Sequence, residues 1–150
     1  MDNKLAQRYQ RIVLQLSELL KKTQDETARM STITAVLHNK MPHFFWTGFY
    51  LLKKGKLIVG PYQGPLACQE LAGKKGVCWS GIQEEKTIIV PDVHKFPGHV
   101  ACDSRSNSEI VVPLKKRDGS VYGVLDVDSR KFNAFSDVDR EWLEKTVKLI

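Results

Sequence analysis

The stretch SEIVVPLKKRDGSVYGVLDVDS, residues 108–129, has the clearest β-hairpin pattern in the sequence. Two runs rich in β-branched residues flank the turn RDGS, and an Asp-Gly pair favours a tight turn between antiparallel strands. Upstream, TIIVPDV (87–93) is typical of a strand that ends at a proline, and residues 44–63 have a second hairpin pattern around the turn KKGK. PLACQEL (65–71) is a further predicted strand. The sequence therefore predicts an antiparallel sheet.

Helical patterns precede and interrupt these strands. Apolar residues in the range 5–20 keep the three-to-four spacing of one helical face. Asp25 is placed to cap a second helix, whose apolar stripe continues to Met41 before Pro42. Residues 77–86, between two predicted strands, have a composition that permits a short helix.

A final helix follows the last strand. Ser136 and Asp139 have the spacing of a capping box, and Phe135 before them is placed to pack against the helix. Two helices, a run of antiparallel strands and a last helix indicate the α+β class, with the N- and C-terminal helices packed on one face of a central sheet. With 150 residues, the chain is expected to be a single domain over residues 1–150.

The composition excludes several classes of protein. With 42% hydrophobic and 27% charged residues, the chain is globular rather than disordered or collagen-like. No apolar run approaches the roughly 18 residues that cross a bilayer, and the segment MDNKLAQRYQ lacks an export signal, so we expect a cytoplasmic protein without membrane contact. The net charge is +6, yet the basic residues are dispersed and not interleaved with aromatic side chains, which disfavours nucleic-acid binding.

The three cysteines, Cys68, Cys78 and Cys102, are an odd number without a secretion signal, which argues against a disulfide framework. Buried thiols, metal ligands and redox chemistry remain. The sequence has no Cys-x-x-Cys or His-x-x-x-His spacing, so a zinc site is disfavoured and we expect no metal. Cys78 follows a glycine turn at the start of a predicted helix, where the helix dipole would lower its pKa. Either Cys68 or Cys78 can approach Cys102.

Residues 94–107 form a long polar loop around Cys102. Long loops in compact domains are often functional, and this one also contains His99, Asp103 and Arg105. Cations lower a cysteine pKa and carboxylates oppose that effect, so these neighbours leave the state of the thiol undecided. The alternative is a small buried side chain, which the polar surroundings disfavour.

Carboxylates and aromatic residues form a second candidate group. Glu109 opens the strand after the loop, and Asp126 and Asp128 stand two residues apart, so both point to one side of their strand. On a buried face they would have to bind a cation or accept protons, whereas at the strand end they would face solvent. Trp46 and Tyr50 are also in alternating register, which suits either an aromatic pocket wall or an ordinary core.

Five segments taken together point to a known family. They occur in the order WTGFYLL (46–52), GPYQGPLACQ (60–69), GVC (76–78), VPDVHKFPGHVACDSRSNSEIVVPL (90–114) and GVLDVDS (123–129). In this order they strongly resemble the free methionine-(R)-sulfoxide reductases, which have the GAF fold, and the resemblance covers about residues 44–136. It implies a cytoplasmic homodimer without a bound cofactor that reduces the R epimer of free methionine sulfoxide, ignores peptide-bound residues, and is recycled by NADPH-linked thioredoxin.

The resemblance also implies roles for the cysteines. Cys102 matches the family's nucleophile, Cys68 its resolving cysteine, and Cys78 a third cysteine of the catalytic set. The implied cycle is attack by Cys102 on the sulfoxide, release of methionine, and capture of the Cys102 sulfenic acid by Cys68 as a disulfide. Trp79 departs from the family, in which we expect a small residue after the third cysteine, and this affects the expected flexibility of the Cys78 turn.

Substrate-binding residues follow from the same resemblance. Glu109, Asp126 and Asp128 match carboxylates that bind the substrate and help to protonate its sulfoxide, and Trp46 and Tyr50 match pocket residues around it. The chemistry agrees, because sulfoxide reduction needs a thiolate to attack sulfur and an acid to convert the oxygen to water. A pocket that pairs with the free ammonium and carboxylate groups would reject a peptide that lacks those charges.

A different class of function remains as the alternative. GAF domains also act as sensory modules that hold a small ligand without turning it over, and a fold alone does not decide function. A sensor is normally joined to an output domain and has no need of three cysteines beside carboxylates. These two points favour the reductase.

Overall fold

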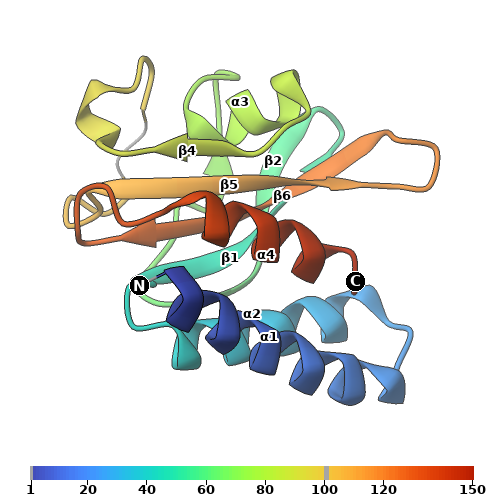
Figure 1. The fold of residues 1–150 in the computed structure, drawn as a ribbon. Helices are drawn as coiled ribbons and strands as arrows, with labels where there is room; N and C mark the ends of the chain where they lie inside the picture. The colour runs from blue at the N-terminus through green and yellow to red at the C-terminus, as the bar shows by residue number, and fades with distance from the viewer. Residues whose placement is uncertain (1, 100–101) are drawn as a thin grey trace.

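The computed structural model describes residues 2–99 and 102–150, and its centre is a six-stranded antiparallel sheet in the order β3-β2-β1-β6-β5-β4 (Figure 1). The strands are β1 (Trp46–Lys53), β2 (Lys56–Gln63), β3 (Glu70–Leu71), β4 (Ile88–Val90), β5 (Ser108–Lys115) and β6 (Val121–Ser129). The two predicted hairpins are confirmed as β1–β2 and β5–β6, and pairing of β1 with β6 joins them in the middle of the sheet.

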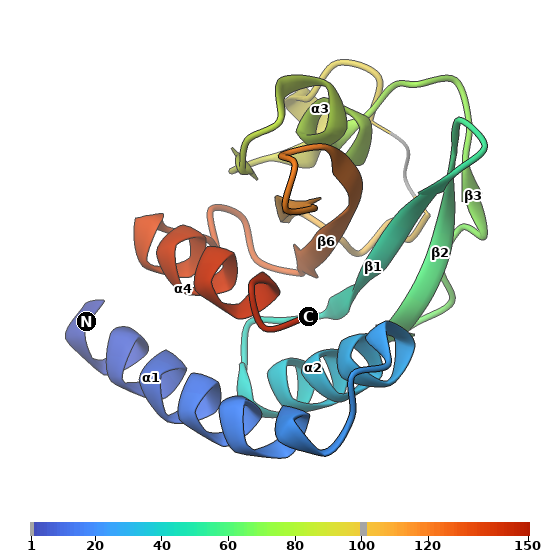
Figure 2. The same ribbon diagram turned by 90° about the vertical axis from the view of Figure 1, so that its right-hand side faces the viewer.

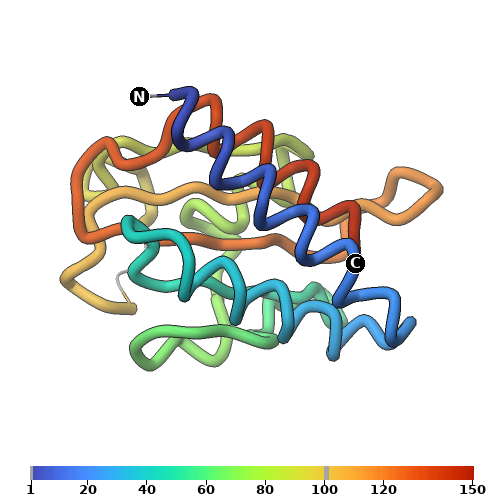
Figure 3. Tube along the Cα trace, turned by 60° about the horizontal axis from the view of Figure 1, so that its bottom comes forward, coloured from blue at the N-terminus to red at the C-terminus, as the bar shows by residue number. Residues whose placement is uncertain are grey.

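Helices cover both faces of this sheet. They are α1 (Asp2–Leu19), α2 (Glu26–Lys40), α3 (Val77–Glu84) and α4 (Asp137–Val147), with two short 3-10 helices, η1 (Leu20–Lys22) and η2 (Val93–Lys95). α1, α2 and α4 lie on one face and α3 on the other (Figure 2). α1 and α4 run side by side (Figure 3). The expected α+β class, with the terminal helices on one face, is confirmed, and the position of α3 on the opposite face is an addition to it.

The alternation of side chains along β5 creates two cores. Ile110, Val112 and Leu114 are buried against the layer of α1, α2 and α4, whereas Val111 packs toward α3. Glu109 shares the side of Val111, because residues two apart on a strand point to the same face. The carboxyl group is therefore placed under α3, away from the larger core.

Two predicted helix caps are confirmed. The Asp25 side chain caps α2, and Ser136 and Asp139 form a capping box at the start of α4. Asp139 is fully buried and also accepts a hydrogen bond of 2.6 Å from the Tyr9 hydroxyl, while a ring nitrogen of His43 lies 3.0 Å away. These contacts join α1, α4 and the segment before β1.

The longest helix described, α1, is amphipathic. Tyr9, Ile12 and Leu16 form its buried side, and most of its other residues are polar. Within the described residues, no helix combines the length and apolar character needed to cross a membrane.

The strand expected over residues 65–71 is mostly absent, which corrects the sequence analysis. Only Glu70 and Leu71 pair with β2, and Cys68 lies before them in an irregular loop. Gly64 has φ +118° and Pro65 has no N–H to donate, so the chain leaves the ladder directly after β2. The resulting loop brings Cys68 close to the loop that contains Cys102.

Candidate active site

A pocket lies on the α3 side of the sheet, between the central strands and the loops that precede β3 and β5. It is lined by Trp46, Tyr50, Leu66, Ala67, Leu71, Lys75, Gly76, Val77, Cys78, His99, Cys102, Asp103, Ser106, Glu109, Asp126 and Asp128. Seven of the eight site residues named from the sequence are in this lining. The eighth, Cys68, is bonded to one of them.

The strand register aligns the carboxylates with the aromatic wall. Asp128 of β6 lies opposite Glu109 of β5 on one side and opposite Trp46 of β1 on the other. Asp126 occupies the next row on the same face, opposite Gly48. Both aspartates line the pocket and so share one face, as their spacing predicts. Asp126 is only 5% exposed, so the solvent-facing alternative is wrong for it.

The aromatic wall depends on the absence of a side chain at Gly48. A Cβ at this position would lie 2.4 Å from the Cβ of Tyr62 and 2.6 Å from the Trp46 ring, so the ring packs across the strand only because residue 48 is glycine. The Trp46 ring stacks with Tyr50 at a centroid distance of 5.7 Å and with Tyr62 at 5.3 Å. Trp46 and Tyr50 line the pocket and are also part of the smaller core. Both alternatives for these residues, an aromatic pocket wall and an ordinary core, therefore apply.

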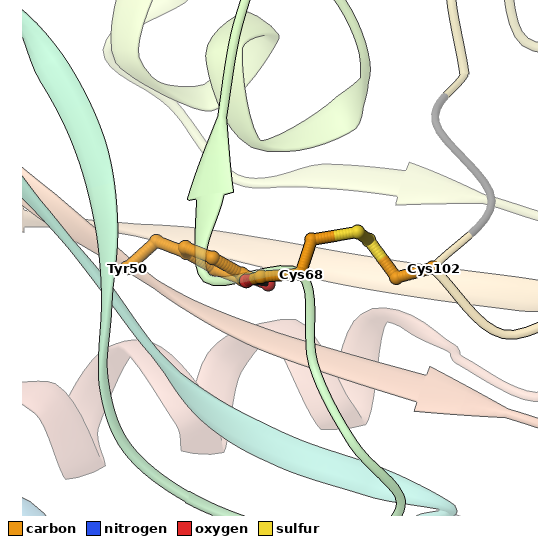
Figure 4. Close-up of a disulfide and its surroundings, with 3 residues drawn as sticks. All are labelled: Tyr50, Cys68 and Cys102. Atoms are coloured by element: carbon orange, nitrogen blue, oxygen red, sulfur yellow. Dashed lines mark hydrogen bonds between the residues drawn. A yellow bond between two sulfur atoms is a disulfide. The ribbon is translucent and has the colours of Figure 1, made fainter.

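Cys68 and Cys102 are joined as a disulfide beside the pocket (Figure 4). Their Cα atoms are 5.4 Å apart although 34 positions separate them in the sequence. Cys102 is exposed and Cys68 is half-buried. The Tyr50 hydroxyl reaches from β1 and donates a hydrogen bond of 2.9 Å to the Cys68 carbonyl oxygen (Figure 4). The pocket wall therefore holds the backbone of one bonded cysteine.

Cys78 is the free cysteine and lies in the first turn of α3. Its side chain is buried, and its Sγ atom and one carboxylate oxygen each from Glu109 and Asp126 lie within 4.8 Å of one another. Burial raises the pKa of the Cys78 thiol, and the negative charges of Asp126 and Glu109 raise it further. The expectation that the helix dipole lowers this pKa is therefore wrong, because desolvation and nearby carboxylates outweigh the dipole of a short helix.

The carboxyl groups under α3 retain protons more strongly than exposed ones. Burial raises the pKa of Glu109, Asp126 and Asp128, and for Glu109 the charges of the two aspartates raise the pKa further. Carboxylates this close cannot all ionise readily in a medium of low dielectric constant. The cluster is therefore suited to binding a cation or to supplying a proton.

The charged residues nearest to Cys102 in the sequence have other contacts. Arg105 donates side-chain hydrogen bonds of 2.7 Å and 3.0 Å to Asp103 and lies over the ring of Phe45. This pairing lowers the pKa of Asp103 to about 2. His99 lines the pocket, but burial lowers its pKa and favours the neutral ring. Neither Arg105 nor His99 therefore offers Cys102 a free positive charge.

Several lining residues escaped the sequence analysis. Lys75 supplies a positive charge from the loop between Gly73 and Gly76. The sequence signal for this residue is the pair Lys74-Lys75, which has a glycine on each side. Leu66 and Ser106 belong to irregular segments without periodicity, so no sequence pattern marks them.

Trp79 has a structural role that explains why a large residue fits after Cys78. The indole is 4% exposed, and its Nε1 donates a hydrogen bond of 3.0 Å to the carbonyl oxygen of Leu71. This hydrogen bond connects α3 to β3 at Leu71, which lies three residues after Cys68 in the sequence. The expected flexibility at this turn is replaced by a fixed contact.

Two buried polar atoms in the pocket lack partners. Among the described residues, Trp46 Nε1 donates no hydrogen bond and Asp126 Oδ1 accepts none. A buried polar group without a partner costs about 1–3 kcal/mol, so such atoms usually meet a ligand or water. Both atoms belong to residues that line the pocket.

Comparisons with known proteins show the family to which the chain belongs. Residues 23–150 match the family of the GAF domain. The chain is 48% identical over 108 residues to the free methionine-R-sulfoxide reductase of Saccharomyces cerevisiae, a match that covers 70% of this chain and 60% of the yeast protein. It is 40% identical over 120 residues to the free methionine-R-sulfoxide reductase of Escherichia coli, covering 80% of this chain and 72% of that protein.

A solved structure extends the similarity to three dimensions. The X-ray structure of free methionine-R-sulfoxide reductase from Neisseria meningitidis in complex with its substrate superposes with a TM-score of 0.91 at 37% sequence identity. The superposition covers 96% of this chain and 86% of the other. Both the fold and the order of its elements are therefore shared with a protein that binds this substrate.

Proposed function

Because the chain belongs to the free methionine-R-sulfoxide reductase family of GAF-domain proteins, we propose that it reduces the R epimer of free methionine sulfoxide to methionine. One observation carries this proposal beyond family membership. A disulfide between two cysteines lies beside a buried cluster of proton-holding carboxyl groups in the same pocket. Two thiols and a proton source are what the reduction of a sulfoxide consumes.

Cys102 is assigned the nucleophilic step. Its exposure at the pocket lining gives a substrate access to the thiolate once the disulfide is reduced. The thiolate attacks the sulfoxide sulfur while the sulfoxide oxygen takes up a proton. The protonated oxygen then moves to the sulfur of Cys102 as the sulfur–oxygen bond and the transient sulfur–sulfur bond break, which leaves methionine and a cysteine sulfenic acid. The Cys68 thiol then attacks the sulfenic acid sulfur, which forms the disulfide and releases water. The two thiols thus supply both electrons.

The carboxyl cluster is assigned to substrate binding and proton supply. Protons held by Glu109 and its neighbours can be given to the sulfoxide oxygen, whose departure needs protonation. We assign to the unpaired Oδ1 of Asp126 the role of accepting a hydrogen bond from the substrate ammonium group. Asp128 lies between Glu109 and Trp46 in the same row and extends the cluster of carboxyl groups.

The aromatic wall and the third cysteine complete the proposed site. Trp46 and Tyr50 would hold the methyl sulfoxide end of the substrate by apolar contact, and the unpaired Nε1 of Trp46 is a donor to a substrate oxygen. Cys78 stays a protonated thiol facing the carboxylates, which supports assigning resolution to Cys68 rather than to Cys78.

Recycling requires an external dithiol. We assign this step to thioredoxin, which is kept reduced by NADPH, because the exposed Cys102 makes the disulfide accessible to a protein thiolate. No bound prosthetic group enters this scheme. We further propose that residues 1–150 act as one domain, that the chain works as a homodimer, and that it works in the reducing cytoplasm.

A substrate comparison tests the proposal. Purified protein is mixed with thioredoxin, thioredoxin reductase and NADPH, and methionine is measured with the free R epimer, the free S epimer or the N-acetylated R epimer. We expect turnover of the free R epimer alone. Folded, reduced protein that binds the R epimer by calorimetry without forming methionine would instead indicate a sensory GAF module.

A further inference from the structure

The thiol of Cys78 and two carboxylates form a compact set of metal-ligand atoms. Cys78 Sγ and one oxygen each from Glu109 and Asp126 lie within 4.8 Å of one another, and all three side chains are buried. The residues come from three different elements, α3, β5 and β6. No ligand spacing in the sequence could therefore indicate this set, and the absence of Cys-x-x-Cys motifs does not bear on it.

A second observation points to a ligand at the same place. Asp126 is 5% exposed, and its Oδ1 atom has no hydrogen-bond partner among the described residues. A buried acceptor without a partner is costly, and like charges nearby add to the cost. A bound cation would satisfy this oxygen and relieve the repulsion between the carboxylates.

We propose that Cys78, Glu109 and Asp126 bind one thiophilic divalent cation such as Zn²⁺ or Cd²⁺, and that the bound cation blocks the pocket and inhibits the protein. The proposal that the cation inhibits the protein rests on the proposed function, whereas the proposal that the cation binds does not. The cation replaces the thiol proton and any proton shared by the carboxyl groups, and these protons leave to solvent. One thiolate and two carboxylates then carry three negative charges against the two positive charges of the ion.

The ligand chemistry selects among cations. Zinc accepts both thiolate and carboxylate ligands at about 2.0–2.3 Å, so modest side-chain rotation closes the set around the ion. Mg²⁺ prefers six oxygen ligands in a regular octahedron and does not favour a thiolate. A cavity of about 50 Å³ adjoins the cluster and gives room for water as a fourth ligand. Three protein ligands and one position open to water are the arrangement of catalytic zinc sites, in contrast to a closed structural site with four protein ligands.

The redox state of the other cysteines provides a clean way to observe binding. In protein oxidised to the Cys68–Cys102 disulfide, Cys78 is the free thiol. A thiolate-to-cadmium charge-transfer band in the ultraviolet therefore reports coordination by Cys78 specifically. This readout needs no substrate and no turnover.

The experiment is a Cd²⁺ titration of the oxidised protein. We expect the band to saturate at one equivalent, to vanish in Cys78→Ser, and to persist in Glu109→Gln with affinity weakened by about tenfold or more through the loss of a charged ligand. Glu141→Gln, which alters an exposed carboxylate on α4, should bind as the unsubstituted protein does. Near-ultraviolet circular dichroism verifies that each variant is folded.

Two results would overturn the proposal. One is the absence of a charge-transfer band in folded, oxidised protein, and the other is equal affinity in the unsubstituted protein and Glu109→Gln. Inhibition of turnover is measured separately, and we expect Zn²⁺ to raise KM and leave kcat unchanged. As a control, the effect of Zn²⁺ on the thioredoxin system alone is measured with another disulfide as its substrate. Failure of the reductase assignment would remove this second readout and leave the cadmium result intact, so the two failures are distinguishable.

Discussion

The hydroxyl of Tyr50 donates a hydrogen bond of 2.9 Å to the carbonyl oxygen of Cys68, which links the pocket wall to the disulfide. Cys68 precedes the two-residue strand β3 and has no ladder partner of its own. The contact with Tyr50 therefore supplies part of the positional restraint that a regular strand would give. In the proposed mechanism, this one side chain couples substrate binding against the Tyr50 ring to the position of the Cys68 thiol.

Replacing Tyr50 by phenylalanine should separate these two contributions. Tyr50→Phe keeps the ring and removes the hydrogen bond, which is worth about 0.5–1.5 kcal/mol. We expect kcat to fall by roughly threefold to tenfold with KM changed less, because the resolving step loses its alignment. A variant whose KM alone rises would show that the hydroxyl serves substrate binding instead.

The resolving role that we propose for Cys68 predicts a trapped intermediate. Cys68→Ser should still form methionine in the first turnover, while steady-state turnover with thioredoxin falls at least about tenfold, because the sulfenic acid on Cys102 cannot be captured. Mass spectrometry after reaction with dimedone should locate the adduct on Cys102. Unchanged steady-state turnover in Cys68→Ser would assign resolution to Cys78.

The buried carboxyl group of Glu109 predicts an unusual dependence of stability on pH. Its pKa in the folded state is raised by burial and by the charges of Asp126 and Asp128, whereas in the unfolded chain it is about 4.3. The folded protein then binds more protons than the unfolded chain, so stability falls as pH rises above the unfolded pKa. Glu109→Gln cannot ionise and escapes this loss.

Thermal unfolding measured between about pH 4 and pH 8 checks this prediction. The lower limit is roughly the pKa of Glu109 in the unfolded chain, and the upper limit is roughly neutral. We expect Glu109→Gln to unfold at a higher temperature than the unsubstituted protein at the upper limit, with the difference vanishing toward the lower limit, and to lose activity. A variant that is less stable at the upper limit would contradict the pKa direction. Glu141→Gln, at an exposed position, should show no such trend.

The close approach at Gly48 predicts a localised packing defect. Gly48→Ala would place Cβ 2.4 Å from Tyr62 Cβ and 2.6 Å from the Trp46 ring, and overpacking of this kind costs about 1–3 kcal/mol. Gly60→Ala is the matched control on β2, since its Cβ would meet Leu51 at an ordinary 3.4 Å. Denaturant unfolding should separate the two variants, and equal stability would exclude a tight contact at residue 48.

The hydrogen bond from the Trp79 indole to Leu71 connects α3 to β3, and its removal should weaken this connection. Trp79→Phe removes the hydrogen bond to the buried Leu71 carbonyl and should lower the free energy of unfolding by about 1–3 kcal/mol. Hydrogen exchange should also rise over Glu70–Leu71, which pairs with β2 along one edge. Exchange that is unchanged there would mean that β2 alone fixes this strand.

Much of the fold could be predicted because its signals are local. The hairpin at residues 108–129 contains its own turn and its own alternation, so both the strands and the shared face of Asp126 and Asp128 follow from the sequence. The capping box at Ser136 is likewise contained in four consecutive positions. Such features depend on no distant residue.

The parts that could not be predicted depend on tertiary contacts. The sequence predicts a strand at Cys68, but its loop conformation depends on Gly64, on the hydrogen bond from Tyr50 and on Cys102, which lies 34 positions away. The raised pKa of Cys78 comes first from burial and then from carboxylates of β5 and β6, and no local pattern indicates that either lies beneath α3. Helix position alone gave the wrong sign for that shift.

A single-turnover experiment measures the proposed reaction itself. Fully reduced protein is mixed with excess free methionine-(R)-sulfoxide in the absence of reductant, then quenched, alkylated and mapped by mass spectrometry. We expect one methionine per chain, loss of the Cys68 and Cys102 thiols to a shared disulfide, and Cys78 recovered as the alkylated thiol. Folded, reduced protein that forms no methionine would contradict the claim that this chain is a reductase.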